Sequence, residues 1–202
     1  MNRPELIRSQ RVVRGRVRRP LKLVITGPFN AGKTTLIRTI SEVAVVGTDR
    51  DVTDETQNIK RKTTVAMDFG RLSFASDLAL FLFGTPGQRR FEVMWEILSE
   101  GMIGFILLVH AGDQRSEEEA AHILATFCAY ADVPFVVGVT HLDEVEDPAD
   151  EVLERIRVRL DLPDDARMMG CDPRRKDDIK ALMLQILIEV RARLEQAEAV
   201  AG

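Results

Sequence analysis

Residues 27–35 read Gly27-Pro28-Phe29-Asn30-Ala31-Gly32-Lys33-Thr34-Thr35, and they follow an apolar run, 21–26, that is typical of a buried strand. A helix-like pattern continues behind them to about residue 42. This strand–loop–helix context is the one in which the spacing G-x-x-x-x-G-K-T forms a phosphate-binding P-loop. Backbone N–H groups of such a loop, together with the start of the helix, form a nest for anionic oxygens. We therefore expect the chain to bind a nucleoside triphosphate.

Two side chains of this loop have specific predicted roles. Lys33 is expected to reach the β- and γ-phosphates, and the Thr34 hydroxyl is expected to ligate Mg²⁺. The alternative, a chance glycine-rich turn before a helix, fits poorly with the spacing of both glycines and with the flanking segments. The predicted nucleotide contacts in the loop are Gly27, Asn30, Ala31, Gly32, Lys33, Thr34 and Thr35.

The composition is that of an ordinary globular domain. The chain has 202 residues, of which 45% are apolar and 30% charged, enough for one α/β domain with a sizeable core. A net charge of −4 gives no bulk electrostatic reason to expect a nucleic-acid partner. Cys128 and Cys171 show no paired pattern, which favours reduced thiols in a cytoplasmic protein. The longest apolar stretches, such as 102–109, are too short to cross a bilayer.

The charge is unevenly distributed along the chain. Arginines crowd the first 19 residues, and we expect this basic N-terminal extension, 1–19, to precede one domain over 20–196 and a C-terminal tail over 197–202. The extension could stay solvated or pack on the domain, bind an acidic partner surface, or contact anionic lipid headgroups. Membrane contact is the least favoured of these three.

From residue 21 onward, strand-like runs alternate with helical patterns, which predicts an α/β fold with a mostly parallel sheet covered on both faces. Strands are expected at 21–26, 64–74, 78–83, 102–109, 135–139 and 166–169, and helices from the P-loop to about 42 and at 91–99, 116–131, 149–160 and 175–196. The strands 64–74 and 78–83 form a hairpin through 75–77, which makes one strand antiparallel. The polar segment 47–62 is interpreted as a long loop. The predicted fold class is thus a three-layer P-loop NTPase.

Ligands of such a sheet bind at the carboxyl ends of its strands, so the loops that follow the strands are the informative ones. Three such loops are Gly84-Thr85-Pro86-Gly87-Gln88, Thr140-His141-Leu142-Asp143 and Gly170-Cys171-Asp172-Pro173. Together with the P-loop and Thr63-Thr64, they have the order and rough spacing of the Ras-like small GTPases. The chain resembles that superfamily from Leu21 onward. It looks most similar to the prokaryotic branch that contains the MglA-type polarity and gliding GTPases and uncharacterised bacterial and archaeal relatives, whose switch II loop has the form Thr/Gly-x-Pro-Gly-Gln.

This resemblance implies a small G domain that binds GTP with Mg²⁺, hydrolyses it slowly to GDP and phosphate, and acts as a molecular switch. It implies that Gln88 orients the attacking water and that the Gly87 N–H contacts the γ-phosphate. Thr64 matches the switch I threonine that closes on Mg²⁺, and only the resemblance separates it from Thr63. The predicted catalytic residues are therefore Gln88, Lys33 and Thr64, and the predicted metal ligands are Thr34 and Thr64.

The identity of the base depends on Asp143. A carboxylate in the base plane accepts from guanine N1–H and N2–H₂, whereas adenine presents an acceptor at N1. The family pattern is Asn/Thr-Lys-x-Asp, which Thr140 fits and in which His141 replaces the lysine. Cys171 and Asp172 lie where the family offers a backbone N–H to guanine O6. The alternative is an ordinary acidic loop after a strand.

Two departures from the family pattern bear on the chemistry. Position 84 is glycine where the family commonly has an aspartate that holds Mg²⁺, and we expect Asp68 to be a poor substitute because its strand position should point it elsewhere. Phe29 stands where glycine is common and should hinder an arginine finger inserted by a partner. Arg61, Arg89 and Arg90 are candidates for a cation in cis, although each also fits a solvated surface arginine.

These departures keep two other functions open: a nucleotide-binding assembly module with negligible turnover, and a P-loop ATPase. The resemblance also implies protein partners, namely an effector and regulatory proteins such as a roadblock-fold activator or an exchange factor.

Overall fold

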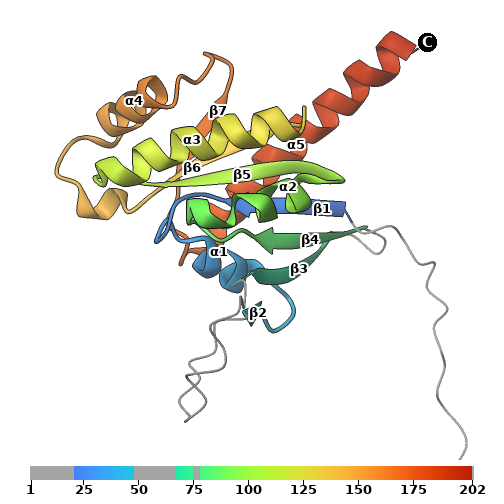
Figure 1. The fold of residues 1–202 in the computed structure, drawn as a ribbon, viewed down its shortest axis with the longest axis horizontal. Coiled ribbons are helices and arrows are strands. Elements are labelled where there is room, and N and C mark those ends of the chain that lie inside the picture. Colours follow the sequence, from blue (N-terminus) through green and yellow to red (C-terminus); the bar gives the residue numbers. More distant parts are fainter. Residues whose placement is uncertain (1–20, 48–66, 75–77, 202) are drawn as a thin grey trace, which may run out of the picture.

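The computed structural model describes residues 21–47, 67–74 and 78–201. The basic extension 1–19, Thr63 and Thr64, and Arg61 lie outside the described residues. The described chain forms a seven-stranded sheet in the order β2-β3-β4-β1-β5-β6-β7, with helices on both faces (Figure 1). This architecture confirms the predicted α/β class and is that of a P-loop NTPase.

The sheet is parallel except at one side. Its strands are β1 (Leu21–Thr26), β2 (Val46–Gly47), β3 (Asp68–Phe74), β4 (Leu78–Gly84), β5 (Met102–His110), β6 (Phe135–Thr140) and β7 (Arg167–Gly170). Strand β3 runs antiparallel to both β2 and β4, whereas β4, β1, β5, β6 and β7 are parallel to one another. The predicted hairpin is therefore confirmed, and the two-residue edge strand β2 is an addition to the prediction.

The helices divide between the two faces of the sheet. They are α1 (Lys33–Ile40), α2 (Glu92–Ser99), α3 (Gln114–Tyr130), α4 (Ala149–Arg159) and α5 (Lys176–Ala201), with 3₁₀ turns η1 (Arg89–Phe91) and η2 (Leu142–Glu144). One core packs α1 and α5 on the sheet through residues such as Leu36 and Ile179. The other packs α2, α3 and α4 through residues such as Trp95, Phe127 and Ile156.

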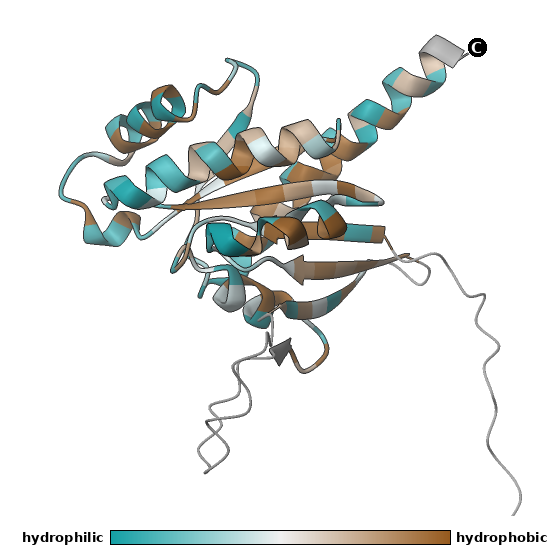
Figure 2. Cartoon of the chain, viewed as in Figure 1, coloured by the Kyte–Doolittle hydropathy of each residue, from teal (hydrophilic) through white to brown (hydrophobic). Residues whose placement is uncertain are grey.

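The central strands are apolar along their whole length because both of their faces are covered. Figure 2 shows these strands in brown between helices whose outer surfaces are mostly teal. Leu23, Val24 and Ile25 of β1 are each fully buried, and so are Phe105 to Val109 of β5. The P-loop thus follows a strand that is held firmly on both sides.

Two helices extend beyond their predicted bounds, whereas the other helix ends lie within about two residues of the prediction. Helix α3 begins at Gln114 and not at Ser116, because the Asp113 side chain caps it by accepting from the Arg115 N–H at 3.0 Å. The Ser116 hydroxyl instead accepts from the His110 N–H at 3.1 Å. Helix α5 continues to Ala201, past the predicted end at 196, and its last turns project beyond the sheet (Figure 1).

Across the segments that the structure describes, no helix has both the length and the apolar character that crossing a membrane requires.

Candidate functional site

The P-loop lies at the carboxyl end of β1, where the backbone turns sharply into α1. Gly27 has a φ of 141°, Asn30 a φ of 63° and Gly32 a φ of 92°. Glycine adopts these values freely, and asparagine is one of the few other residues that tolerates the left-handed region. A Cβ at Gly27 would also lie 2.2 Å from the Leu108 carbonyl oxygen of β5. The loop therefore has the curved backbone that cradles anionic oxygens.

The middle of the P-loop packs on two other predicted loops. A Cβ at Gly32 would lie 2.9 Å from Pro173 Cγ, so the loop after β7 closes directly on the P-loop. From the loop after β6, the buried Thr140 Oγ1 donates to the Ala31 carbonyl and to the Val109 carbonyl, both at 3.2 Å. The fold thus brings the predicted phosphate loop and both predicted base loops together.

Lys33 begins α1, and its side chain is buried within the P-loop. Its Nζ donates to the Gly27 carbonyl at 2.8 Å and to the Pro28 carbonyl at 2.5 Å. Burial lowers the pKa of Lys33 to about 8, an effect that the charges of Asp68 and Glu119 partly oppose. The only lysine of the P-loop therefore places its ammonium group among the loop's carbonyls, next to where phosphates would bind.

The next two residues of α1 differ in surroundings. Thr35 is exposed, whereas the half-buried Thr34 Oγ1 donates a short hydrogen bond to Asp68 Oδ2. The expectation that Asp68 points away from the site is wrong. Asp68 is the first residue of β3, and it is paired directly with Gly84, the last residue of β4, at the sheet edge where α1 starts. The predicted hairpin through 75–77 already implied this pairing, so its register was the signal that could have identified Asp68.

The loop after β4 is held at its start by β1. The Thr85 N–H donates to the Ile25 carbonyl at 3.0 Å, and the buried hydroxyls of Thr85 and Thr26 are 2.9 Å apart. These contacts extend the pairing of β1 and β4 beyond the end of β4. They fix where the following residues leave the sheet.

The second half of this loop lies on the P-loop. A Cβ at Gly87 would lie 2.5 Å from the Phe29 backbone nitrogen, so the loop after β4 and the P-loop are in direct contact there. The fully buried Trp95 of α2 donates from Nε1 to the Pro86 carbonyl at 2.9 Å. Gln88 follows and is exposed. The structure therefore places Gly87 against the phosphate loop and Gln88 at the adjoining surface.

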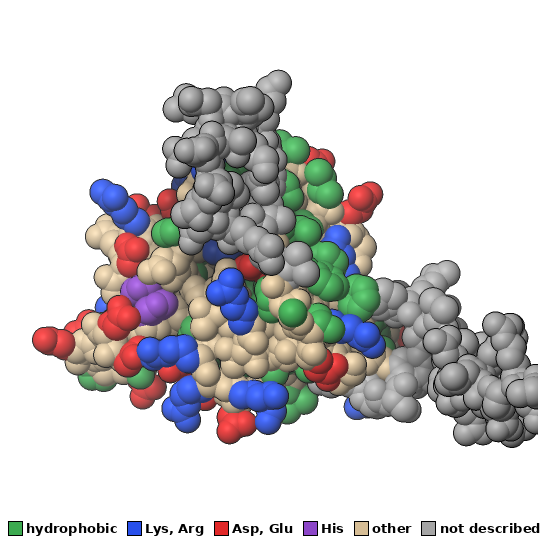
Figure 3. Space-filling view, turned by 90° about the horizontal axis from the view of Figure 1, so that it is seen from below, with side chains coloured by type: hydrophobic (Ala, Val, Ile, Leu, Met, Phe, Trp, Pro, Cys, Tyr) green, Lys and Arg blue, Asp and Glu red, His purple; other side chains and the backbone are tan. Residues whose placement is uncertain are grey.

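Two histidines stack on each other at the carboxyl ends of β5 and β6, beside the predicted base loop. His141 follows β6 with a φ of 59°, and its ring stacks on His110 of β5 with centroids 3.8 Å apart and planes inclined by 5°. Burial, and next the nearby His110, lower the pKa of His141. Figure 3 shows histidine side chains next to acidic and basic ones on one face of the molecule. His141 is at the position where the resemblance led us to expect a lysine, and His110 adds a second ring beside it.

Asp143 follows in η2 and forms an ion pair with the loop after β7. Arg174 Nη2 lies 2.9 Å from Asp143 Oδ2, and Arg174 Nε lies 2.8 Å from Asp172 Oδ1. Sequence analysis did not single out Arg174. Arg174 directly follows the predicted loop and is two residues from Asp172, and this was the available signal.

Cys171 is inert in this setting. It is buried, and burial raises the pKa of its thiol to about 12, so the thiol stays protonated at neutral pH. Its N–H donates to the Val139 carbonyl at 2.8 Å as part of the sheet. Its side chain belongs to the core that packs α1 and α5 on the sheet.

Of the arginines predicted as cis cations, only Arg89 and Arg90 lie in the described residues, and neither forms a hydrogen bond with the P-loop there. Arg89 and Arg90 are exposed in η1, and the Arg90 guanidinium lies over the Phe91 ring, 4.7 Å from its centroid. Phe29 is 71% exposed, so its ring stands out from the loop toward solvent. Among the described residues, no group of three or more histidine, cysteine or acidic side chains is arranged to hold a metal ion. A metal here would need oxygens from elsewhere, such as hydroxyls and phosphates.

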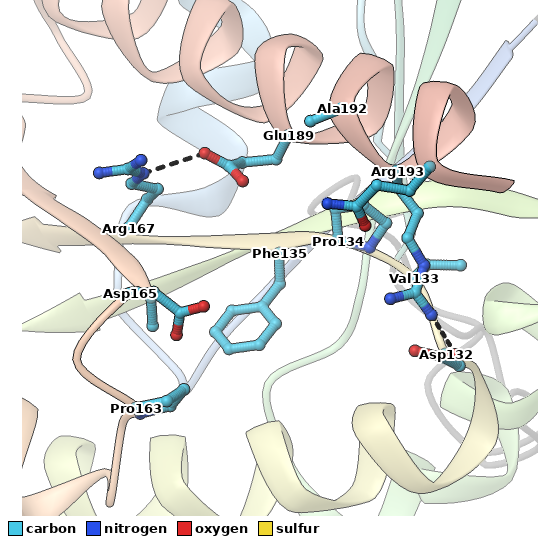
Figure 4. A pocket seen from close by; sticks show the side chains of 12 residues that line it. Asp132, Val133, Pro134, Phe135, Pro163, Asp165, Arg167, Glu189, Ala192 and Arg193 are labelled. Carbon is cyan, nitrogen blue, oxygen red and sulfur yellow. Dashed lines mark hydrogen bonds and ion pairs between the residues drawn. The ribbon is translucent and has the colours of Figure 1, made fainter. Parts of the chain in front are cut away.

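A pocket of about 330 Å³ lies at the amino ends of β6 and β7, away from the carboxyl ends that the P-loop and the other predicted loops follow (Figure 4). Its walls include Phe135 at the start of β6, Arg167 at the start of β7 and Glu189 of α5. The Arg167–Glu189 ion pair, 3.0 Å from Nε to Oε1, lies at its side. Because the P-loop follows the carboxyl end of the parallel strands, this pocket is remote from the predicted site.

Comparison with known proteins assigns the family. Residues 46–183 match a family described as conserved hypothetical ATP-binding proteins, a match that begins after the P-loop. An uncharacterised protein of Methanocaldococcus jannaschii, MJ1339, is 31% identical over 107 residues, which are 52% of this chain and 61% of that protein. The family match covers more than half of the chain. The fold of the chain also contains a complete P-loop. The protein therefore belongs to the family of conserved hypothetical ATP-binding proteins and is a nucleotide-binding P-loop protein.

Proposed function

We propose that the protein is a GTP-binding molecular switch of the Ras-like type, related to the MglA-type branch, that hydrolyses GTP slowly to GDP and phosphate. The observation that carries this proposal is the contact between Gly87 and the P-loop backbone, where a Cβ would come within 2.5 Å of the Phe29 nitrogen. A phosphate held by the P-loop lies within reach of the loop that follows β4. The loop after β4, and α2 behind it, can thereby change position according to whether a γ-phosphate is bound.

Guanine is the proposed base. The carboxylate of Asp143 is 61% exposed beside Thr140 and His141, and it can accept from guanine N1–H and N2–H₂. The His110–His141 stack supplies flat aromatic rings close to it. We propose that Thr140 acts by tying this loop to the P-loop, since its hydroxyl donates to Ala31.

Mg²⁺ is the proposed metal, and the chemistry of the oxygens fits it. Mg²⁺ prefers hard oxygen ligands and is usually bound by one or two side chains together with phosphate oxygens and water. The Thr34 hydroxyl and the Asp68 carboxylate, joined by their hydrogen bond, offer two such oxygens at the start of α1. Thr64 remains a proposed third ligand. When bound, the ion would neutralise charge on the β- and γ-phosphates.

Catalysis would consist of positioning and electrostatics. Lys33 and the N–H groups of the P-loop stabilise the charge that develops on the transferred phosphoryl group. Gln88, one residue beyond Gly87, orients the attacking water in line with it. Among the described residues, no arginine donates a hydrogen bond to the P-loop, and we propose that hydrolysis is slow without a partner protein.

Loss of the γ-phosphate would release Gly87 and Thr64, which loosens both loops. The helix α2 that follows Gln88 has two large apolar side chains at its surface, Val93 at 70% and Ile97 at 59% exposure. We propose that this surface is read by regulatory proteins, such as a roadblock-fold activator or an exchange factor, and by an effector. A cytoplasmic location is proposed with it, because Cys128 and Cys171 are both free thiols.

Single-turnover release of phosphate from GTP-loaded protein tests the switch. The Gln88→Ala variant should slow release at least tenfold, because the water loses the group that orients it. Gln114→Ala is the matched control, since Gln114 is also an exposed glutamine at a helix start but lies on α3. A wild-type rate equal to spontaneous GTP decay, and unchanged by Gln88→Ala, would establish the non-hydrolysing assembly module instead.

An ATPase is the second candidate, because the family description names ATP. In addition, the backbone N–H groups of Asp172 and Arg174 already donate to side-chain carboxylates, so they are not available to O6 of guanine. Competition of GTP and ATP for the same site decides between them. We expect GTP to displace a labelled nucleotide at a concentration at least a hundredfold lower than ATP. The Asp143→Asn variant should gain affinity for xanthosine triphosphate. A wild-type preference for ATP would overturn the guanine assignment.

A further inference from the structure

Arg174 lies between two carboxylates at the base end of the site. Its Nη2 donates to Asp143 Oδ2 at 2.9 Å and to Asp172 Oδ2 at 2.9 Å, while Nε donates to Asp172 Oδ1 at 2.8 Å. Asp172 thus holds the guanidinium in two-point contact, and Arg174 in turn contacts the carboxylate proposed to select the base. The side chain of Arg174 is 66% exposed and that of Asp143 is 61% exposed, so a ligand can reach both.

The backbone of this turn has no N–H group left for a base. The Cys171 N–H donates to the Val139 carbonyl, and the Asp172 N–H donates to Asp178 Oδ2 at 3.0 Å. Pro173 has no N–H, and the Arg174 N–H donates to Asp172 Oδ1 at 2.9 Å. A base acceptor facing this turn must therefore find another donor.

The guanidinium has donors to spare. Of its five N–H groups, the one on Nε and the two on Nη2 serve the two carboxylates, which leaves both N–H groups of Nη1. Within the described residues, neither Nη1 nor Asp143 Oδ1 takes part in a hydrogen bond. The Arg174–Asp143 ion pair thus offers a free donor, Arg174 Nη1, beside a free acceptor, Asp143 Oδ1, among the described residues.

We propose that Arg174 is a specificity-determining residue that donates to O6 of guanine, so that the Arg174–Asp143 pair reads the edge of the base. Guanine presents the acceptor O6 beside the donor N1–H, which matches a guanidinium donor beside a carboxylate acceptor. Arginine donating to guanine O6 is also a common contact in nucleic-acid recognition. Adenine presents a donor at N6 beside an acceptor at N1, so both of its groups would face groups of the same kind.

This inference rests on the proposed guanine specificity, and its test separates the two. GDP, 6-thio-GDP and IDP each displace a bound fluorescent GDP, and the displacement curves give the affinity of each nucleotide. Comparing these affinities shows how much each group on the edge of the base contributes. 6-thio-GDP weakens only the acceptor at position 6, whereas IDP lacks the N2 amino group. Wild type should bind 6-thio-GDP about tenfold more weakly than GDP, as expected for losing a hydrogen bond to a charged donor.

Arg174→Ala should bind GDP about tenfold more weakly and should no longer distinguish it from 6-thio-GDP. Its ratio of GDP to IDP affinity should stay close to that of wild type, because Asp143 still accepts from the base. Arg174→Lys, which keeps one charged donor, should recover part of the discrimination at position 6. Arg174 is at the surface, so the variants are expected to fold, and far-ultraviolet circular dichroism checks this.

Two control variants sharpen the result. Arg175→Ala removes a neighbouring exposed arginine that pairs with Asp178 and not with Asp143, and it should leave all three affinities unchanged. Asp178→Ala frees the Asp172 N–H and should likewise leave the discrimination at position 6 unchanged. The inference is overturned if Arg174→Ala keeps the wild-type ratio of GDP to 6-thio-GDP, or if Asp178→Ala increases it. Wild type preferring ADP to GDP would instead overturn the proposed function itself.

Discussion

Asp68 and Gly84 are direct partners across the β3–β4 ladder, and the Asp68 side chain fills the space where a side chain at position 84 would begin. A Cβ on Gly84 would lie 3.0 Å from Asp68 Cβ and 3.4 Å from Asp68 Oδ2. Only one of these two positions can therefore hold a carboxylate without a shift of the strands. The carboxylate that the resemblance places after β4 is here available from the neighbouring strand.

This relationship predicts a strong effect of Asp68→Ala on metal binding. Removing the carboxylate should raise the Mg²⁺ concentration needed to retain GDP at least tenfold, because one hard oxygen near Thr34 is lost. The measurement is the release rate of a fluorescent GDP as a function of free Mg²⁺. Asp113→Ala, which removes a carboxylate that caps α3, is the control and should not change the Mg²⁺ dependence.

A swap of the two positions gives a stricter version of the same test. Gly84→Asp alone should weaken folding, because its Cβ would lie 2.8 Å from Cδ1 of the buried Ile37 and 3.0 Å from Asp68 Cβ. In the double variant Asp68→Gly with Gly84→Asp, the carboxylate moves to the neighbouring strand and the contact with Asp68 is relieved, while Ile37 Cδ1, 2.8 Å from the new Cβ, must still shift. We expect Mg²⁺-dependent GDP retention to recover in part. Unchanged Mg²⁺ dependence in Asp68→Ala would remove Asp68 from the metal site.

Gly87→Ala should uncouple the loop after β4 from the P-loop. The added methyl group would lie 2.5 Å from the Phe29 nitrogen and 2.6 Å from the Pro28 carbonyl carbon, and backbone atoms cannot move aside as a side chain can. We expect GTP hydrolysis to slow at least tenfold while GDP affinity changes less than threefold. Gly101→Ala is the control, since a Cβ there has no atom within 4 Å and only its φ of 69° resists the change. Equal hydrolysis rates in wild type and Gly87→Ala would contradict the coupling.

Trp95→Phe should destabilise the protein through Pro86. The buried indole Nε1 donates to the Pro86 carbonyl, and phenylalanine would leave that acceptor unpaired and a small cavity beside it. The expected loss is about 1–3 kcal/mol in the free energy of unfolding. Urea unfolding followed by circular dichroism measures it. Tyr130→Phe alters a partly exposed aromatic residue and should cost far less; losses of equal size would mean that the Trp95 contact adds little.

The parts of the fold that were predictable are those with a local signal. The P-loop at Lys33 and the buried strand at 102–109 are readable because spacing and apolar runs depend only on neighbouring residues. The loops at Gly87 and Asp143 followed from the general position of sites at the carboxyl ends of parallel strands. Strand β2 was missed because two residues at a sheet edge carry no period of their own.

The parts that were not predictable depend on which residues meet across the sheet. The stack of His110 on His141 comes from the neighbouring ends of β5 and β6. The register of Asp68 with Gly84 is a different case, because the predicted hairpin implied it although Asp68 was expected to point elsewhere. The link from Arg174 to Asp143 joins two loops that are distant in the chain. Such pairs become visible only when strand order and register are known.

Lys33 should make nucleotide affinity depend on pH. Its pKa in the free protein is lowered from the ordinary value of 10.5 to about 8, chiefly by burial, and bound phosphates favour its charged form. Well below pH 8 the free protein already carries the proton, so affinity for GDP should change by no more than about twofold between pH 7 and 8. Above pH 8 the free protein loses the proton and must take it up again on binding, so affinity should fall by up to tenfold per pH unit. Titrations of fluorescent GDP from pH 7 to 9.5 at fixed Mg²⁺ measure this fall.

Two controls separate this effect from general titration of the surface. Lys33→Met should bind GDP weakly at every pH and without the fall above pH 8, whereas Lys176→Ala, which alters an exposed lysine at the start of α5, should keep the wild-type profile. The same pKa shift has a definite sign for stability. Between about pH 8 and 10.5 the unfolded chain binds more protons at Lys33 than the folded protein does, so the free energy of unfolding of the nucleotide-free protein should rise with pH across that window. A GDP affinity that stays level up to pH 9.5 would show that Lys33 keeps its proton in the free loop, and would place its ammonium group in a more solvated position than the carbonyls of Gly27 and Pro28 provide.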